Sequence, residues 1–352
     1  MRISFLDRWL PAWIILAMAA GLALSQLVPG IGDALGSAKI GGTSIPIAIG
    51  LLVMMYPPLA KVRYDKAGSI AADKRLMTVS LIANWGIGPL LMFILAWIFL
   101  PDQPELRTGV IIVGLARCIA MVLVWSDLSC ADRDASAVLV AINSIFQVLM
   151  YGVLGWFYLQ ILPSWLGLST TSAEFSFWSI VLSVLVFLGV PLLLGILSRT
   201  LGERTRGRDW YENEYLPRVS PLALIGLLYT IVLLFAMQGN QVIANPGAVA
   251  RVALPLVCYF FIMFGVALAT AKMSRMDYAQ SASVAFTAAG NNFELAIAVC
   301  IGTFGANSGQ ALAGTIGPLV EVPVMVALVY IMRGLGPKLF AGDPTLPEPA
   351  SH

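Results

Sequence analysis

Long apolar segments alternate with short polar ones along almost the whole chain. A segment of about 20 mostly apolar residues is long enough to cross a bilayer as a helix. The pattern therefore predicts ten spans, near Leu10–Val28, Ile40–Ala60, Leu76–Leu100, Thr108–Trp125, Ala135–Leu159, Phe177–Ser198, Pro221–Gln238, Val249–Ala271, Ala282–Phe304 and Ala311–Met332. The first span follows Arg2 and Arg8, as a signal peptide would. We interpret it as helix one, because it is long, lacks a small-residue cleavage site and precedes further spans.

Two of these spans carry polar residues near their middle. Arg117 and Cys118 interrupt the fourth span, and the ninth contains Asn291, Asn292 and Glu294. A charge at the centre of a bilayer costs at least ~2.5–3.5 kcal/mol on insertion scales, so it is kept where it faces a cavity or a partner. Polar interruptions in two membrane helices are typical of a substrate site at the bilayer midplane. The pattern therefore favours a transporter.

Composition supports an all-α membrane protein. The chain of 352 residues is 59% hydrophobic and 11% charged, with a mean hydropathy of +0.86, whereas soluble domains carry ~25% charged residues. A net charge of +2, with no basic tract, zinc-ligand spacing or nucleotide-binding motif, argues against nucleic acid and nucleotide as partners. The four cysteines show no metal spacing, so we expect free thiols and no cofactor.

The distribution of basic residues predicts the orientation. With the N-terminus inside, the cytoplasmic segments hold 17 lysines and arginines and the opposite side holds 3, with Arg117 in the membrane. Such an excess of basic residues marks the cytoplasmic side. We therefore expect a multi-pass protein of the plasma membrane with both termini in the cytoplasm.

A weak internal repeat divides the single transporter domain, residues 1–352. Shifting the second half back by 174 residues places Asn291 over Arg117 and Asn292 over Cys118. Repeat one covers about residues 9–160 and repeat two about 176–333, while 339–352 is expected to be a flexible tail. Each repeat holds five spans, an odd number, so the second enters the membrane from the opposite face. This predicts two inverted five-helix repeats, the architecture of alternating-access transporters. The basic segment Leu201–Arg218 would join them.

Cys118 has two possible roles. A buried cysteine is usually a small apolar side chain, but the neighbouring Arg117 favours the reactive thiolate. Burial favours the neutral thiol, so the residues alone leave both roles open. Cys130 lies ~18 Å away if the intervening chain is helical, so a soft ligand at Cys118 would meet one thiol, which suits transit better than storage.

Two carboxylates lie deep in predicted spans. Glu294 is a candidate proton carrier, because an intramembrane carboxylate is by default functional. Glu321, between Pro318 and Pro323, could carry protons or pair with a backbone donor or with Arg117. Arg117 itself is expected to support the site as a counter-ion rather than to bind a neutral substrate.

Amide side chains complete the candidate site. Asn143 and Gln147 are four residues apart and therefore share one face of the fifth span. Asn291 and Asn292 could bind substrate, although capping of half-helices is the favoured role. We expect Asn143, Asn291 and Asn292 in the substrate site with Cys118 and Glu294, and Gln147 in support.

The stretches around these residues resemble the arsenite efflux permeases of the Acr3 type, in the bile acid/arsenite/riboflavin transporter superfamily. The resemblance runs from about Trp9 to Arg333. It is carried by the segments 114–125 (GLARCIAMVLVW), 141–148 (AINSIFQV), 291–299 (NNFELAIAV), 308–313 (SGQALA) and 317–324 (GPLVEVPV).

The resemblance implies ten helices in two inverted repeats, with helices 4 and 9 crossed and partly unwound. It also implies export of trivalent arsenic as arsenite, with antimonite, the antimony(III) analogue, as an alternative substrate, in exchange for protons. Cys118 matches the essential cysteine of the family, which would hold arsenic(III) as a metalloid, and Glu294 matches its essential carboxylate. Two positions depart from the family pattern: Gly290 replaces an expected serine, and Ser126-Asp127 stands where asparagine is frequent.

Three other classes compete with this hypothesis. A sodium-coupled organic-anion carrier of the same superfamily would need more hydroxyl and carboxylate ligands in spans four and nine and would not need Cys118. An intramembrane enzyme with a Cys118 nucleophile lacks a histidine base, because the single histidine is His352. A structural or receptor protein does not explain ionisable residues at matching depth in two spans. The prediction is therefore a transporter and not an enzyme.

Overall fold

The computed structural model describes residues 9–28, 30–37, 39–40, 43–64, 68, 70, 72–119, 121–169, 177–305 and 308–346. Most of these residues are helical. The helices, including π-helical turns (η), are α2 (Leu10–Leu27), α3 (Ile31–Ser37), α4 (Ile45–Ala60), α6 (Lys74–Leu81), η1 (Ile82–Ile87), α7 (Gly88–Phe99), α8 (Pro104–Leu115), α9 (Met121–Leu128), α10 (Arg133–Trp156), η2 (Phe157–Ile161), α11 (Leu162–Trp165), α12 (Phe177–Val184), η3 (Leu185–Gly189), α13 (Val190–Arg206), α14 (Arg208–Trp210), η4 (Tyr211–Tyr215), α15 (Leu216–Ala244), α16 (Pro246–Met273), α17 (Tyr278–Ala289), α18 (Phe293–Phe304) and α19 (Gly309–Leu339). Two short strands, β1 (Lys39–Ile40) and β2 (Thr43–Ser44), pair antiparallel.

The lengths and composition of the helices are those of a multi-pass membrane protein. Within the described residues, 6 helices are long and apolar enough to cross a membrane, and shorter apolar helices accompany them. The long ones are Lys74–Phe99, Arg133–Trp165, Ile180–Arg206, Arg208–Ala244, Pro246–Met273 and Gly309–Leu339. The all-helical membrane class predicted from the apolar pattern is therefore confirmed.

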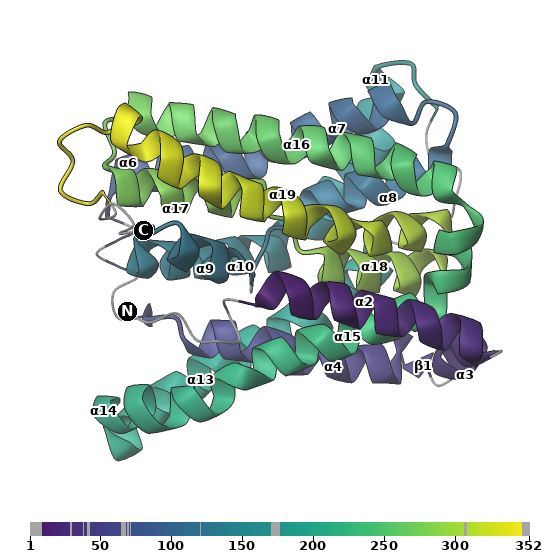
Figure 1. Cartoon of the computed structure of the whole chain (residues 1–352), viewed down its shortest axis with the longest axis horizontal. Helices are drawn as coiled ribbons and strands as arrows, with labels where there is room; N and C mark the ends of the chain where they lie inside the picture. Colours follow the sequence, from purple (N-terminus) through teal and green to yellow (C-terminus); the bar gives the residue numbers. More distant parts are fainter. Residues whose placement is uncertain are drawn as a thin grey trace.

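Figure 1 shows the helices in two groups. Helices α2, α4, α13 and α15 pack on one another as one layer, and α16, α17 and α19 pack with α7, α8 and α18 in a second group. Small residues let the backbones of the first layer approach closely, as is usual between membrane helices. A Cβ atom on Gly226 of α15, for example, would lie 2.8 Å from the backbone nitrogen of Met54 in α4.

Prolines and polar residues within the spans do not all break helices. The third span is continuous from Lys74 to Phe99, because a π-helical turn accommodates Asn84 and the helix runs on through Pro89. Helix α4 likewise continues past Pro57 and Pro58 to Ala60. Prolines and a buried asparagine are thus accommodated in these two spans without a break.

Two spans are broken, and they are the two that carry the central polar residues. Helix α8 ends at Leu115 and α9 begins at Met121, while α17 ends at Ala289 and α18 begins at Phe293. The expected basic joint between the two halves, Leu201–Arg218, is helical on both sides of Gly207, whose φ of 87° ends α13.

The segment after α19 differs from the flexible tail expected at 339–352. Asp343 accepts a hydrogen bond of 2.8 Å from the backbone NH of Tyr278, and the Thr345 hydroxyl accepts one of 3.2 Å from Ala279. These are the first amides of α17, which have no partner within their own helix. Residues 343–345 therefore form a cap on α17, which we call the tail cap; 347–352 lie outside the described residues.

Candidate functional site

The breaks in the two interrupted spans contact each other directly. Ala116 and Gly290 have extended backbones, so each chain leaves its helix at this point. The Asn292 NH donates to the Ala116 carbonyl over 3.1 Å, and the Cys118 NH donates to the Gly290 carbonyl over 3.3 Å. Arg117 and Asn291 are thereby paired in an isolated antiparallel bridge. We call these two segments, 116–118 and 290–292, the crossing.

The Arg117 side chain is completely buried and is held by oxygen atoms of neutral groups. Its Nη1 donates to the Tyr259 hydroxyl over 2.7 Å and to the Ala288 carbonyl over 3.4 Å, and its Nη2 donates to the Gly114 carbonyl. Gly114 and Ala288 lie at the C-terminal ends of α8 and α17. Each such helix end carries about half a negative charge, so one guanidinium faces two negative helix ends.

The partners of Arg117 are not the carboxylates that the sequence offered. Among the described residues no ion pair joins Arg117 to Glu321 or to another carboxylate, and its Nε makes no hydrogen bond. The counter-charge of Arg117 is therefore supplied by helix carbonyls. The sequence could not show this, because the partial negative charge at a helix end comes from backbone carbonyls and not from charged side chains.

Two residues that support Arg117 were missed by the sequence analysis. The Tyr259 hydroxyl, on α16, lies 3.4 Å from the Ala288 carbonyl and so bridges Arg117 to the end of α17. A Cβ atom on Gly88 would lie 2.7 Å from Arg117 Nη1 and 3.1 Å from the Tyr259 oxygen, so this position needs glycine. One signal was available: Tyr259 lies in mid-span, whereas membrane tyrosines gather at the interfaces.

The two asparagines at the crossing serve opposite helix ends. The Asn291 amide donates to the carbonyls of Val113 (2.9 Å) and Ala116 (3.1 Å) at the end of α8. Asn292 is the N-cap of α18, where its side-chain oxygen accepts from the Leu295 NH over 3.0 Å. The capping role favoured from the sequence is thus present at Asn292, and Asn291 caps a C-terminus instead.

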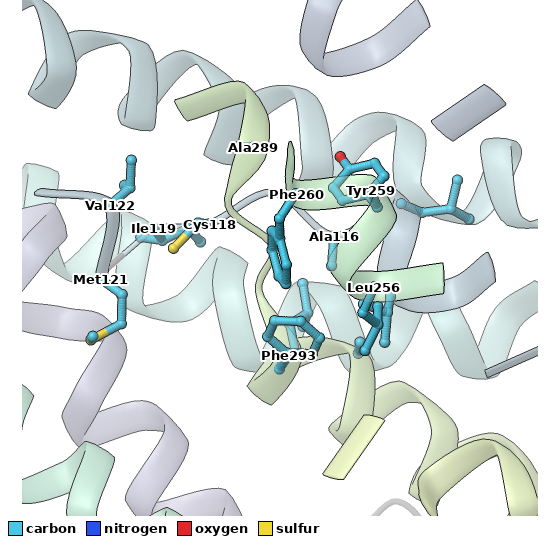
Figure 2. Packing of buried hydrophobic residues seen from close by; sticks show 14 of the residues in the cluster. Ala116, Cys118, Ile119, Met121, Val122, Leu256, Tyr259, Phe260, Ala289 and Phe293 are labelled. Carbon is cyan, nitrogen blue, oxygen red and sulfur yellow. The ribbon is translucent and has the colours of Figure 1, made fainter. Parts of the chain in front are cut away.

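Cys118 points to the other side of the crossing from Arg117, because successive side chains of an extended segment alternate. In Figure 2 its sulfur lies on the same side as Met121 and Val122, whereas Tyr259 lies on the side of Ala116. The thiol is 4% exposed, and the amides of Met121 and Val122, in the first turn of α9, interact with it. The sulfur therefore lies at the positive end of a half-helix.

The structure brings both intramembrane carboxylates to the thiol side of the crossing. Glu321 and Glu294 are the charged groups that interact electrostatically with Cys118, and they also interact with each other. Glu294 lies in the first turn of α18 and is partly exposed. Glu321, on α19, is 5% exposed, and the backbone NH of Asn291 interacts with its carboxylate. The Oε1 atom of Glu321 has no hydrogen-bond partner in the described part of the chain.

Asn143 and Gln147 lie four residues apart on α10, and Gln147 contacts the crossing. The Gln147 side-chain oxygen accepts the backbone NH of Arg117, and the Asn143 oxygen accepts the indole NH of Trp85 over 3.0 Å. Both residues are buried, and their amide nitrogens make no hydrogen bond among the described residues. Trp85 was not singled out from the sequence.

The crossing therefore has two chemically different sides. Arg117, Tyr259 and the helix carbonyls form a supporting side, whereas Cys118, Glu294 and Glu321 form a side with one soft ligand and two proton-accepting groups. No group of three or more His, Cys, Asp and Glu side chains that could hold a metal ion occurs among the residues described. A single thiol can bind a soft atom transiently but cannot enclose it.

Comparisons with known proteins place the chain in a family. Residues 48–245, more than half of the chain, match the model of the Sodium Bile acid symporter family. The Arsenical-resistance protein Acr3 of Corynebacterium glutamicum is 70% identical over 349 residues, which cover 99% of this chain and 94% of that protein. The chain is a member of this symporter family, of the Acr3 type. The resemblance found in the segments around Cys118 and Glu294 is therefore confirmed.

More distant relatives cover nearly the same length. An uncharacterized transporter of Synechocystis is 35% identical and covers 94% of this chain and 89% of its own. The Arsenical-resistance protein Acr3 of Alkaliphilus metalliredigens is 32% identical, covering 94% of this chain and 92% of its own. The family and these relatives are transport and resistance proteins, in agreement with a membrane protein that is not an enzyme.

Proposed function

We propose that this protein exports trivalent arsenic, as arsenite, across the plasma membrane in exchange for protons, with antimonite, the antimony(III) analogue, as an alternative substrate. One observation carries the proposal: a buried thiol, Cys118, lies at the N-terminal turn of a half-helix with Glu321 and Glu294 as its charged neighbours. The high identity to an arsenical-resistance protein over nearly the whole chain supports the choice of substrate.

The crossing supports an inverted repeat. A shift of 174 residues exchanges Ala116 with Gly290 and Cys118 with Asn292. Under this exchange, the hydrogen bond from the Asn292 NH to the Ala116 carbonyl corresponds to the one from the Cys118 NH to the Gly290 carbonyl. The two bonds therefore occupy equivalent positions of the repeat. Two five-span repeats of opposite orientation, covering about 9–160 and 176–333, would be related by an axis through the crossing. Alternating access would then expose the thiol side of the crossing to each face of the membrane in turn.

The thiol would act as a transient ligand. Arsenite is a small neutral hydroxide, As(OH)3, and its soft arsenic atom suits sulfur. In the inward-open state the Cys118 thiol forms one S–As bond, while its proton leaves with one hydroxyl as water. In the outward-open state water cleaves that bond, which restores the thiol and releases As(OH)3. Asn291 and Asn292 lie at the crossing and Asn143 lies one helical turn from Gln147, which contacts it, so their amides could orient the hydroxyls.

Glu294 would carry the exchanged proton, with Glu321 as its partner. The Glu294 carboxylate takes a proton from outside when the site is open outward, and it returns the proton to the cytoplasm after the site turns inward. One proton enters for each neutral arsenite that leaves, so transport would move one charge and draw on the membrane potential, at ~2.3 kcal/mol per 100 mV.

Uptake of arsenite into everted membrane vesicles tests the proposal. Vesicles with and without an imposed pH gradient would be compared for the wild type and Cys118→Ser. Cys300→Ser is the matched control, because Cys300 is equally buried but lies in α18 away from the crossing. We expect uptake driven by the gradient in the wild type and the control, and its loss in Cys118→Ser.

Two results would overturn the proposal. Uptake by Cys118→Ser at the wild-type rate would remove the thiol from the mechanism. Uptake that requires sodium and does not depend on the pH gradient would favour the sodium-coupled carrier of organic anions. The name of the matching family model refers to such a carrier.

A further inference from the structure

A surface groove separate from the crossing lies where α4, α13 and η4 meet. It has a volume of about 500 Å³ and is lined by Tyr56, Leu194, Leu197, Ser198, Leu201 and Tyr215. Its lining is mostly apolar, and the three leucines are each about half exposed, at 50%, 52% and 57%. The groove therefore opens toward the lipid side of the molecule rather than into its core.

The leucines form a stripe along α13 that ends in a cation. Leu194, Leu197, Leu201 and Arg204 are spaced by three or four residues, so they lie on one face of the helix. Arg204 is exposed, in the last turn of α13, and makes no ion pair within the described residues. Arg204 therefore lies about one turn beyond Leu201, the last leucine of the groove, on the same face of α13.

The acidic groups at this end of the molecule are already paired with other arginines. Glu212 contacts Arg63 (3.0 Å), Arg199 (2.9 Å) and Arg208 (3.1 Å). Glu203 contacts Arg199 over 2.9 Å. The carboxylates next to Arg204 are therefore neutralised, which leaves its charge available to a ligand.

Hydroxyl groups from α4, η4 and α13 also line the groove. Tyr56 and Tyr215 share a hydrogen bond between their hydroxyls, and Ser198 lies within 3.2 Å of the Tyr211 hydroxyl. Tyr211 in turn stacks on Tyr215, with ring centroids 5.0 Å apart. The lining thus combines aromatic rings and hydroxyl groups with apolar leucines. Amphipathic rings of this kind are typical of the headgroup level of a membrane.

We propose that this groove is a binding site for an anionic glycerophospholipid. An acyl chain lies along Leu194, Leu197 and Leu201, and the phosphate is bound by Arg204. A basic position between membrane helices is the usual recognition element for an anionic headgroup. The apolar stripe supplies the affinity shared by all phospholipids, and Arg204 supplies the preference for negative charge.

Native mass spectrometry of the detergent-purified full chain tests the proposal. Dioleoylphosphatidylglycerol and dioleoylphosphatidylcholine would be titrated separately, and the affinity for the first bound lipid measured. One arginine at a membrane surface is worth about a fivefold change in affinity for anionic lipid. We therefore expect Arg204→Gln to weaken phosphatidylglycerol binding about fivefold and to leave phosphatidylcholine binding unchanged.

Arg206→Gln is the matched control. Arg206 lies in the same last turn but off the leucine stripe, with its guanidinium over the Trp210 ring at 4.8 Å. Equal losses in the Arg204 and Arg206 variants would show general attraction to a basic helix end and would overturn the site. Equal binding of both lipids by the wild type would also overturn it, as would occupation of the groove by a second copy of the chain.

A second variant tests the apolar part. Leu197→Asn should weaken binding of both lipids by a similar factor, because it makes the leucine stripe more polar without changing the charge. An unchanged affinity for both lipids in this variant would place the lipid elsewhere. Circular dichroism and size-exclusion chromatography would confirm that each variant is folded before it is compared.

Discussion

Arg117 and Asn291 are paired at the crossing. Arg117 caps the end of α17, the helix that precedes Asn291, and Asn291 caps the end of α8, the helix that precedes Arg117. The Arg117 guanidinium donates to Ala288 in the last turn of α17, and the Asn291 amide donates to Val113 and Ala116 at the end of α8. Helix ends buried in a membrane protein have no water to bind their carbonyls. The two breaks therefore satisfy each other, and neither would be stable without its partner.

Tyr259→Phe tests the support given to Arg117. Loss of this hydroxyl removes a hydrogen bond to a buried cation, so we expect the free energy of unfolding to fall by about 1.5–3 kcal/mol. Tyr151→Phe is the matched control, because its buried hydroxyl donates to a neutral carbonyl, Ile112, over 2.9 Å. We expect a smaller loss there, about 0.5–1.5 kcal/mol. Chemical denaturation in detergent measures both; equal losses would contradict a special role for Arg117.

Gly290→Ser tests the space beside the thiol. A Cβ atom on residue 290 would lie 2.9 Å from the Cys118 Cβ and 3.3 Å from the Met325 Cε. Overpacking of this kind costs about 1–3 kcal/mol, and it would displace the thiol. We expect slower arsenite transport and altered labelling of Cys118 by a maleimide.

The control for this change is Gly265→Ser in α16, where an added Cβ would meet no atom within 4 Å. It should transport at the wild-type rate. If Gly290→Ser transported and reacted with maleimide like the wild type, the thiol would not depend on this glycine.

Glu294→Gln tests proton exchange. The amide can neither release nor take up a proton at neutral pH, so uptake into everted vesicles should lose its dependence on the pH gradient. Glu105→Gln is the control, because Glu105 binds the Gly309 amide over 3.1 Å at the opposite end of α8 from the crossing. Glu294→Gln vesicles that still respond fully to the gradient would exclude Glu294 as the carrier.

Asp343→Ala tests the tail cap through its pH dependence. Burial raises the pKa of the Asp343 carboxyl, but hydrogen bonds from Thr345 and from the Tyr278 backbone outweigh this effect and hold the pKa below its usual value. Its stabilising contribution is therefore complete above the unfolded pKa of about 3.9, and it is lost as the pH falls through the folded value.

We accordingly expect Asp343→Ala to lower the free energy of unfolding at pH 7 by about 0.5–2 kcal/mol, the usual effect of losing a cap. The difference from the wild type should shrink toward zero below about pH 4. Thermal melting at pH 7 and pH 3 measures it. A difference of the same size at both pH values would show that the carboxylate charge does not hold the tail cap.

The sequence located the crossing because charged and amide residues stand out in apolar spans. It predicted that Arg117 and Asn291 occupy matching positions, and the structure pairs them. It could not predict that Arg117 points away from Cys118, since this depends on the extended backbone between α8 and α9. Tyr259 and Gly88 were missed for a related reason: each is an ordinary membrane residue until the fold brings it to Arg117.

The tail cap was missed because its partners are distant in sequence. Asp343 and Thr345 lie in a polar segment rich in proline and are 65 and 66 residues from the amides that they bind. Nothing in their local sequence distinguishes them from a solvated tail. Only the packing of α19 beside α17, which places Gly336 and Phe340 against Tyr278, brings them together.

The same contact has a consequence for how the protein is made. Asp343 and Thr345 are synthesised after all the helices that the structure describes, yet they complete the first turn of α17, which runs directly into the crossing. During translation, Asp277 can already cap the Gln280 amide of α17, whereas the Tyr278 and Ala279 amides must wait for these later residues. A chain that terminates before Asp343 would therefore contain all the described helices but lack two of the contacts that anchor the start of α17.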